Sequence, residues 1–308
     1  MRYYHAFTLF FIFNFHSLSA GDYIINSYDN HNIHGTLINS KNPNSTLAII
    51  ISGSGPTDRD GNNTSLKSDY LKMLAERLQE NGISTYRYDK RGVGKSIGDL
   101  KTGNEIKFLD YINDVVSIIN HFKESKNFKE VVVIGHSEGA LIGMIASQLI
   151  ADRFISIAGA GEDYLSLIER QLSIQPPFVK SMSEPIIEKL KNKKLVDSVP
   201  PLLNSLFRLD AQLYLIDASS YDPSEEISKL NIPILIIQGS TDIQIEVNDA
   251  LILHKAAKNS SLEIIDGMNH VFRQASDNRL LNLQTYGNPE LPIDNNMVNI
   301  ISEFIDEK

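Results

Sequence analysis

The sequence predicts an α/β fold with a mostly parallel, doubly wound sheet and one long helical insertion. Short, wholly apolar runs, typical of strands buried in a parallel sheet, alternate with segments whose apolar residues recur at helical spacing. Such alternation implies parallel strands with helices on both faces. From residue 161 to about residue 230 the strand signal stops and only helical periodicity remains. A chain of 308 residues, 42% of them hydrophobic, suffices for one large domain with an insertion or for two ordinary domains.

The composition excludes several classes of partner and site. A formal net charge of -9 argues against a nucleic-acid or anionic-membrane partner, because both need a positive protein surface. The sequence contains no cysteine, which excludes disulfides, thiolate metal sites and a cysteine nucleophile. The redox compartment is left undecided.

The amino terminus has the features of a secretory signal. Arg2 precedes an apolar stretch over residues 6–15, which is too short to cross a bilayer, and small residues follow up to Ala20. We expect residues 1–20 to be a signal peptide and residues 21–308 to be the exported chain, periplasmic or secreted, with no stable membrane insertion after cleavage. Leu18 is an imperfect residue for a cleavage site, so an uncleaved hydrophobic anchor is the alternative.

The first half of the chain predicts a hairpin followed by strands and helices in alternation. Residues 22–38 alternate around a turn at 30–32, and residues 47–51 form an apolar central strand. The loop at 52–61 contains glycines, which let the backbone approach a ligand and turn its N–H groups inward. Three further elements are a helix over 68–79, a strand over 83–88 and an amphipathic helix over 108–122.

Residues 89–96 imitate the end of a phosphate-binding loop. The full motif needs a glycine where this chain has Asp89, whose carboxylate would oppose a phosphate. We therefore predict a solvated turn here and no nucleotide site.

A nucleophile elbow is predicted at residues 135–139. A β-branched run over 131–134 enters Gly135-His136-Ser137-Glu138-Gly139, and a segment rich in Ala, Leu, Ile and Met follows. Small residues two positions either side of a serine let the strand and the helix approach closely, so that the hydroxyl stands clear of the sheet. Ser137 is the candidate nucleophile. The alternative is an ordinary glycine-bounded turn in which the serine only caps the helix.

The second half of the chain predicts a cap and the end of the sheet. After a strand over 154–159, the proline-interrupted helical segment at 161–230 is interpreted as a cap over the active site. Its apolar residues either line a pocket or hold the cap helices together; we single out Leu165, Phe178, Leu203, Phe207 and Tyr214. The remaining core elements are strands over 232–239 and 262–265 and a closing helix over 297–305.

The activating base and acid are chosen by position. His270 follows the last strand on a glycine-containing loop, whereas His136 adjoins the serine and should point away from it. The other six histidines lie in the amino-terminal segment, the hairpin or predicted helices. Asp242 follows a core strand on a loop and gives the chain order serine, acid, histidine that accompanies a Gly-x-Ser-x-Gly elbow. Asp266 is the rival acid.

An oxyanion also needs backbone N–H donors. The residue after the nucleophile, Glu138, supplies one, and the loop after the strand at 47–51 supplies the other, for which we choose Ser54. Only the backbone of these residues enters the prediction.

These segments together resemble the α/β-hydrolase superfamily, in its serine esterase and serine-aminopeptidase-like branch. The resemblance spans nearly all of the expected mature chain and rests on residues 135–139, 239–242, 267–270, 52–61 and 89–94. It implies an α/β-hydrolase fold with a helical cap and a triad of Ser137, Asp242 and His270. Where many members have His-Gly after the third strand, this chain has Ser52-Gly53.

The leading hypothesis is an exported serine hydrolase that cleaves carboxylic esters through an acyl-Ser137 intermediate. His270 acts as general base and Asp242 fixes its tautomer, so the substrate is a small ester or acyl compound and no cofactor or metal is expected. Thioesterase activity is one alternative on the same triad. Aminopeptidase activity is another, and it needs a cap carboxylate to bind the substrate ammonium, with Glu162, Glu169 and Glu184 as candidates. A non-catalytic ligand-binding relative is the alternative from another class.

Overall fold

The structure is a computed structural model that describes residues 21–42, 45–98, 106–148 and 150–307. The predicted signal peptide at 1–20 lies outside the described residues. No helix within the described ranges is long and apolar enough to cross a membrane.

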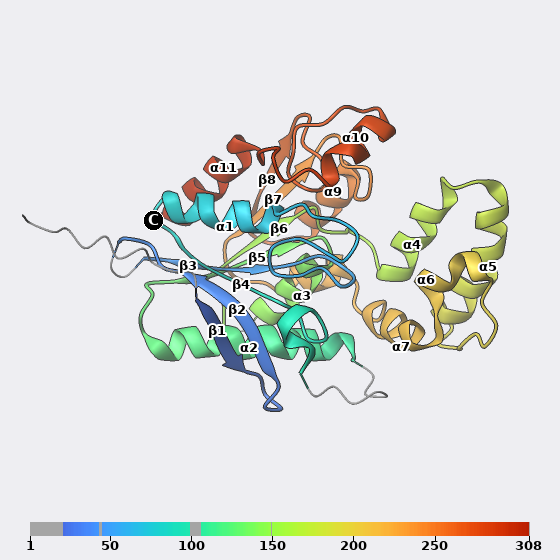
Figure 1. The fold of residues 1–308 in the computed structure, drawn as a ribbon, viewed down its shortest axis with the longest axis horizontal. Coiled ribbons are helices and arrows are strands. Elements are labelled where there is room, and N and C mark those ends of the chain that lie inside the picture. The colour runs from blue at the N-terminus through green and yellow to red at the C-terminus, as the bar shows by residue number, and fades with distance from the viewer. Residues whose placement is uncertain (1–20, 43–44, 99–105, 149, 308) are drawn as a thin grey trace, which may run out of the picture.

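One eight-stranded sheet forms the centre of the molecule, in the order β1-β2-β4-β3-β5-β6-β7-β8 (Figure 1). The first two strands form the predicted antiparallel hairpin, β2 pairs antiparallel with β4, and all later pairs are parallel. The predicted mostly parallel α/β architecture is therefore confirmed. The strands are β1 (Asp22–Asn26), β2 (Asn32–Ile38), β3 (Leu47–Ile51), β4 (Ser84–Tyr88), β5 (Val131–His136), β6 (Arg153–Ile157), β7 (Ile234–Gly239) and β8 (Ser260–Ile265).

Helices cover both faces of the sheet, which explains why β3 and β5 are apolar throughout. In β3, Ile49 and Ile51 pack on the side of α2 (Phe108–Ser125) and α3 (Glu138–Ser147). Ala48 and Ile50 pack on the side of α1 (Tyr70–Glu80) and α11 (Asn295–Asp306), so every position of the strand is buried. Two further helices of the main domain are α9 (Val247–Ala256) and α10 (Arg279–Tyr286).

A helical lobe is inserted between β6 and β7, over the segment where the sequence predicts a cap. Figure 1 shows α4 to α7 standing beside the sheet, near α3. The lobe has an apolar core that includes Leu165, Leu203 and Phe207, whereas Phe178 is 57% exposed. Of the five apolar residues singled out, those three therefore hold the lobe together. Its helices are α4 (Tyr164–Ser173), α5 (Pro177–Lys191), α6 (Asn204–Phe207) and α7 (Leu209–Ala218). The next helix, α8 (Pro223–Ser228), packs against α3 and α9 of the main domain.

Two helices differ from the prediction. The helix predicted over 68–79 begins at Tyr70, because Asp69 before it adopts a left-handed backbone with φ 57°. Helix α10 was not predicted; its leucines Leu280, Leu281 and Leu283 are exposed, so it lacks an apolar stripe that faces the core.

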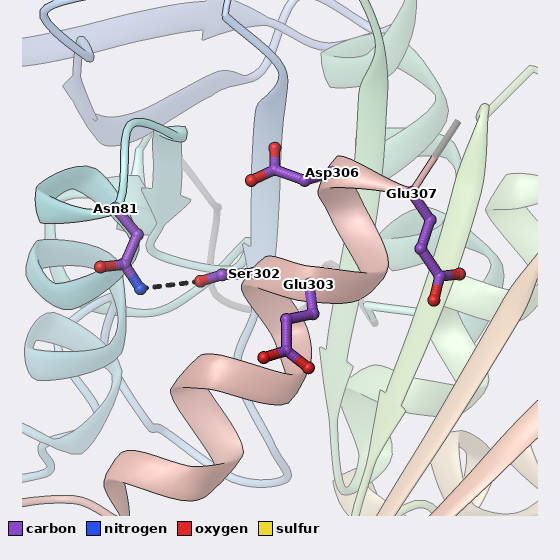
Figure 2. A pocket seen from close by; sticks show the side chains of 5 residues that line it. All are labelled: Asn81, Ser302, Glu303, Asp306 and Glu307. Carbon is purple, nitrogen blue, oxygen red and sulfur yellow. Dashed lines mark hydrogen bonds between the residues drawn. The ribbon is translucent and has the colours of Figure 1, made fainter.

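An open hollow lies between the C-terminal ends of α1 and α11, where the Asn81 amide donates to the Ser302 hydroxyl at 2.9 Å (Figure 2). It is lined by Asn81, Ser302, Glu303, Asp306 and Glu307. Residue 81 precedes β4 and so marks the amino-terminal edge of the parallel strands. Ligand sites of such sheets lie at the carboxyl edge. We therefore expect the functional site at the opposite end of the strands from this hollow.

The turn after β4 corrects the sequence analysis. A solvated turn was predicted at 89–96, but Asp89, Lys90 and Arg91 are only 3%, 1% and 5% exposed. Their charges are matched inside the protein: Arg59 donates to Asp89 at 2.8 Å and Arg91 donates to Asp114 at 2.7 Å. Buried charges require such partners, and these partners come from distant parts of the chain.

Replacement of Arg91 tests how much its buried ion pair with Asp114 contributes to stability. Arg91→Met should lower the free energy of unfolding by about 3 to 5 kcal/mol, because it leaves the buried Asp114 without its cation. Urea denaturation at neutral pH measures the change. Lys95→Met is the matched control on the same turn: this side chain is 64% exposed, and its loss should change stability by less than about 0.5 kcal/mol. Equal unfolding midpoints for the two variants would contradict the prediction.

Candidate active site

The elbow lies between β5 and α3, at the carboxyl edge of the sheet. Ser137 has φ 56° and ψ -121°, a strained backbone for a residue with a side chain. A β-carbon at Gly135 would lie 2.3 Å from the Gly139 carbonyl oxygen, and one at Gly139 would lie 2.5 Å from the Ile51 carbonyl oxygen. Both positions therefore exclude side chains, and the Ser137 N–H is fixed by the Ile157 carbonyl at 3.0 Å. This is the backbone that a nucleophile elbow requires.

Asp242 and His270 come together at the same edge. Nδ1 of His270 lies 2.8 Å from Oδ2 of Asp242, and both side chains are nearly excluded from water. The other Asp242 oxygen accepts the N–H groups of Gln244 and Ile245, so the turn after β7 fixes the carboxylate. The rival acid, Asp266, accepts a hydrogen bond from Ser240 at 3.1 Å. Of the two acids, Asp242 is the one whose side chain forms a hydrogen bond with His270.

His136 lies beside this pair. Its ring centre is 4.7 Å from that of His270, while its expected direction away from Ser137 stays a prediction. Its Nε2 contacts the His270 carbonyl at 2.9 Å, and its Nδ1 contacts the Tyr70 hydroxyl at 3.1 Å. Burial, together with the neighbouring His270 and Lys90, holds the pKa of His136 well below its usual range. His136 is thus a neutral support for the His270 loop.

The loop after β3 lies against the elbow. A β-carbon at Gly53 would lie 3.2 Å from the Cβ atom of Ser137 and 3.3 Å from Nδ1 of His136. The N–H groups of Ser54 and Glu138 were predicted as oxyanion donors. Within the part of the chain that the structure describes, neither N–H donates a hydrogen bond to another backbone group. Both remain available to a ligand.

A buried polar cluster that was not predicted from the sequence lies behind the elbow. The Glu138 side chain accepts hydrogen bonds from Lys90 at 2.7 Å, from Tyr164 at 2.9 Å and from Tyr214 at 2.6 Å. Tyr164 belongs to α4 and Tyr214 to α7, so the helical lobe reaches the residue next to Ser137. Burial first, and then the Glu138 carboxylate, raise the pKa of both tyrosines well above the ordinary value, which keeps the hydroxyls protonated as donors.

One signal in the sequence pointed to this cluster. A glutamate in the first turn of a buried helix needs a buried cation. The lysine after β4 is a natural choice, because β4, β3 and β5 are neighbours in the sheet and their carboxyl ends meet. No group of three potential metal ligands occurs among the residues with described positions.

The chain is similar to a known protein family and to a curated esterase. The family described as serine aminopeptidase, S33, matches residues 66–274. Esterase EstD of Thermotoga maritima is 31% identical over 232 residues, which cover 72% of this chain and 53% of that protein. The chain thus spans about half the length of this curated relative.

Solved structures share the fold at low sequence identity. Est1E of Butyrivibrio proteoclasticus, solved with ferulic acid bound, has a TM-score of 0.61 at 21% identity, covering 92% of this chain and 100% of that chain. The α/β hydrolase GrgF of Penicillium sp. also has a TM-score of 0.61, at 17% identity, covering 92% and 97%. An esterase of Exiguobacterium antarcticum has a TM-score of 0.58 at 16% identity, covering 93% and 100%.

The neutral state of His136 predicts a pH dependence of stability. Its pKa in the folded chain is lower than the unfolded value of about 6.5, so the unfolded chain binds the extra proton as the pH falls below that value. Stability should therefore be lost on acidification, by up to about 1.4 kcal/mol per pH unit from this group. His136→Phe should reduce the loss between pH 7 and pH 5, measured by urea denaturation. Exposed His254→Gln is the control, and an unchanged slope in His136→Phe would contradict the argument.

Proposed function

The chain belongs to the serine aminopeptidase S33 family of α/β hydrolases, and from this premise we propose that it is a serine hydrolase that cleaves carboxylic esters. The observation that carries the proposal is the buried Asp242–His270 hydrogen bond at the sheet edge that presents the strained Ser137. The similarity to Esterase EstD and to esterase structures supports ester substrates.

In the proposed acylation step, His270 takes the proton of the Ser137 hydroxyl. Because Nδ1 of His270 faces the Asp242 carboxylate, the ring proton belongs on Nδ1 and Nε2 is the basic nitrogen. The serine oxygen attacks the ester carbonyl, and the oxyanion is held by the N–H groups of Ser54 and Glu138. His270 then protonates the leaving alcohol, and an acyl-Ser137 ester remains.

In the proposed deacylation step, water replaces the alcohol. His270 takes a proton from the water as it attacks the acyl-Ser137 carbonyl, and the same two N–H groups hold the second oxyanion. Collapse of this intermediate releases the carboxylic acid and returns the proton to Ser137. The cycle uses no group beyond those of the chain, the ester and water.

The lobe carboxylates favour an ester over an aminopeptidase substrate. Glu162 lies 2.5 Å from Arg170, Glu169 lies 2.6 Å from Lys191, and Glu184 lies 3.6 Å from Lys180. Each carboxylate that was considered for binding a substrate ammonium already has a cation as its partner. Thioesters share the acyl-serine chemistry, and a substrate panel separates them from oxygen esters.

The triad assignment is tested by covalent labelling and by exchange of the acid. A fluorophosphonate should form one adduct, on Ser137, that is absent in Ser137→Ala, as read by intact mass and peptide mapping. Asp242→Asn should lower kcat for a p-nitrophenyl ester by about 10⁴-fold, because the wrong histidine tautomer is then favoured. Asp266→Asn is the matched control and should retain activity. Equal losses in both variants, or no adduct on folded protein, would reject the assignment.

We also propose that the chain is exported and processed after Ala20. The support is the apolar segment and the small residues at its end. Expression of the whole chain in a bacterial host should give a periplasmic or secreted protein whose mass corresponds to a start at Gly21. A product that retains residues 1–20 and stays in the membrane fraction would instead support the uncleaved anchor.

A further inference from the structure

Lys90 is a buried cation that the proposed mechanism does not use. Its side chain is 1% exposed, and its ammonium donates to the Gly53 carbonyl at 2.6 Å and to the Glu138 carboxylate at 2.7 Å. The ring of Tyr111 lies 5.2 Å from the ammonium. Removal of an ammonium from water is costly, so its partners hold it firmly in place.

The contact with Gly53 fixes the direction of the next N–H group. The Gly53–Ser54 peptide is trans, as are all described peptides, so the Gly53 carbonyl and the Ser54 N–H point in opposite directions. A carbonyl that faces Lys90 therefore directs the Ser54 N–H away from Lys90. If the peptide were flipped, the Ser54 N–H would face the ammonium of Lys90. This arrangement is unfavourable, because the hydrogen of the N–H group carries a partial positive charge.

The contact with Glu138 holds the other predicted donor. Glu138 is the first residue of α3, and its own N–H follows the nucleophile directly. One oxygen of its carboxylate accepts from Lys90, and the other accepts from Tyr164 and Tyr214. Both oxygens are thus engaged, and the start of the helix cannot turn without breaking these bonds.

We propose that Lys90 is a positioning residue that aligns both backbone donors of the oxyanion hole. The inference rests on the proposed function, since an oxyanion forms only if Ser137 attacks an acyl group. Lys90 acts through the Gly53–Ser54 peptide on one side and through the Glu138 side chain on the other. Neither of these contacts is with the reacting atoms themselves.

A purely electrostatic role is the competing explanation. In that case Lys90 only neutralises Glu138, and removing both charges should restore activity. Lys90→Met and the double variant Lys90→Met/Glu138→Gln separate the two roles. The double variant leaves no unpaired buried charge, yet the Gly53 carbonyl still lacks its donor, so it carries the test even if the single variant fails to fold.

The experiment compares kcat, KM and inhibition by a trifluoromethyl ketone, whose hemiketal oxyanion mimics the intermediate. Rates are referred to sites titrated with fluorophosphonate, and the substrate is a p-nitrophenyl ester. The double variant should lose about tenfold to about a hundredfold in kcat, with KM within about threefold, because full loss of one oxyanion donor costs about 10²- to 10³-fold. The inhibition constant should rise by the same factor as kcat falls. A destabilised but correctly aligned site would not show this parallel.

Arg91→Met provides a matched control, because it also removes a buried cation from the same turn. It should lower stability and leave kcat per titrated site unchanged. Wild-type kcat and inhibition in the double variant would overturn the role of Lys90 while leaving the proposed function intact. A folded wild-type protein that neither labels at Ser137 nor cleaves esters would overturn the proposed function, and the role of Lys90 with it.

Discussion

A carboxylate and an ammonium, both excluded from water, lie directly behind the strained turn at Ser137. Neither Lys90 nor Glu138 is tolerable there alone, because an unpaired buried charge costs several kcal/mol. The pair therefore constrains everything it touches: the turn after β4, the loop after β3 and the first turn of α3. These three segments end or begin at neighbouring central strands, so one ion pair fixes their relative positions at the carboxyl edge of the sheet.

The features that the sequence predicts well are those encoded locally. The run at 47–51 is apolar throughout because helices cover both faces of β3. The glycines at 135 and 139 are required because a β-carbon there would lie 2.3 and 2.5 Å from a backbone carbonyl oxygen. Asp242 and His270 were predicted from the order of the strands that they follow, and the structure places Oδ2 of Asp242 2.8 Å from Nδ1 of His270. In each case a short pattern and its physical cause lie in the same segment.

The features that the sequence did not reveal depend on pairs that are far apart in the chain. Three consecutive charged residues, 89–91, look solvated, yet each finds a buried or nearly buried partner between 23 and 48 residues away. Hydropathy alone cannot separate an exposed charge from one neutralised by tertiary contact. Helix α10 was missed for the opposite reason, since its exposed leucines carry no amphipathic pattern.

The buried cluster around Glu138 includes side chains from the helical lobe. The lobe supplies two of the three donors to the Glu138 carboxylate. If the lobe were absent, one carboxylate oxygen would lose both of its hydrogen bonds and the charge would need water or a new partner. The elbow can therefore keep a buried glutamate beside its serine only while Tyr164 and Tyr214 are in place. In this chain the lobe is part of the structure that holds the residue next to Ser137, and its packing contributes to the geometry of the turn between β5 and α3.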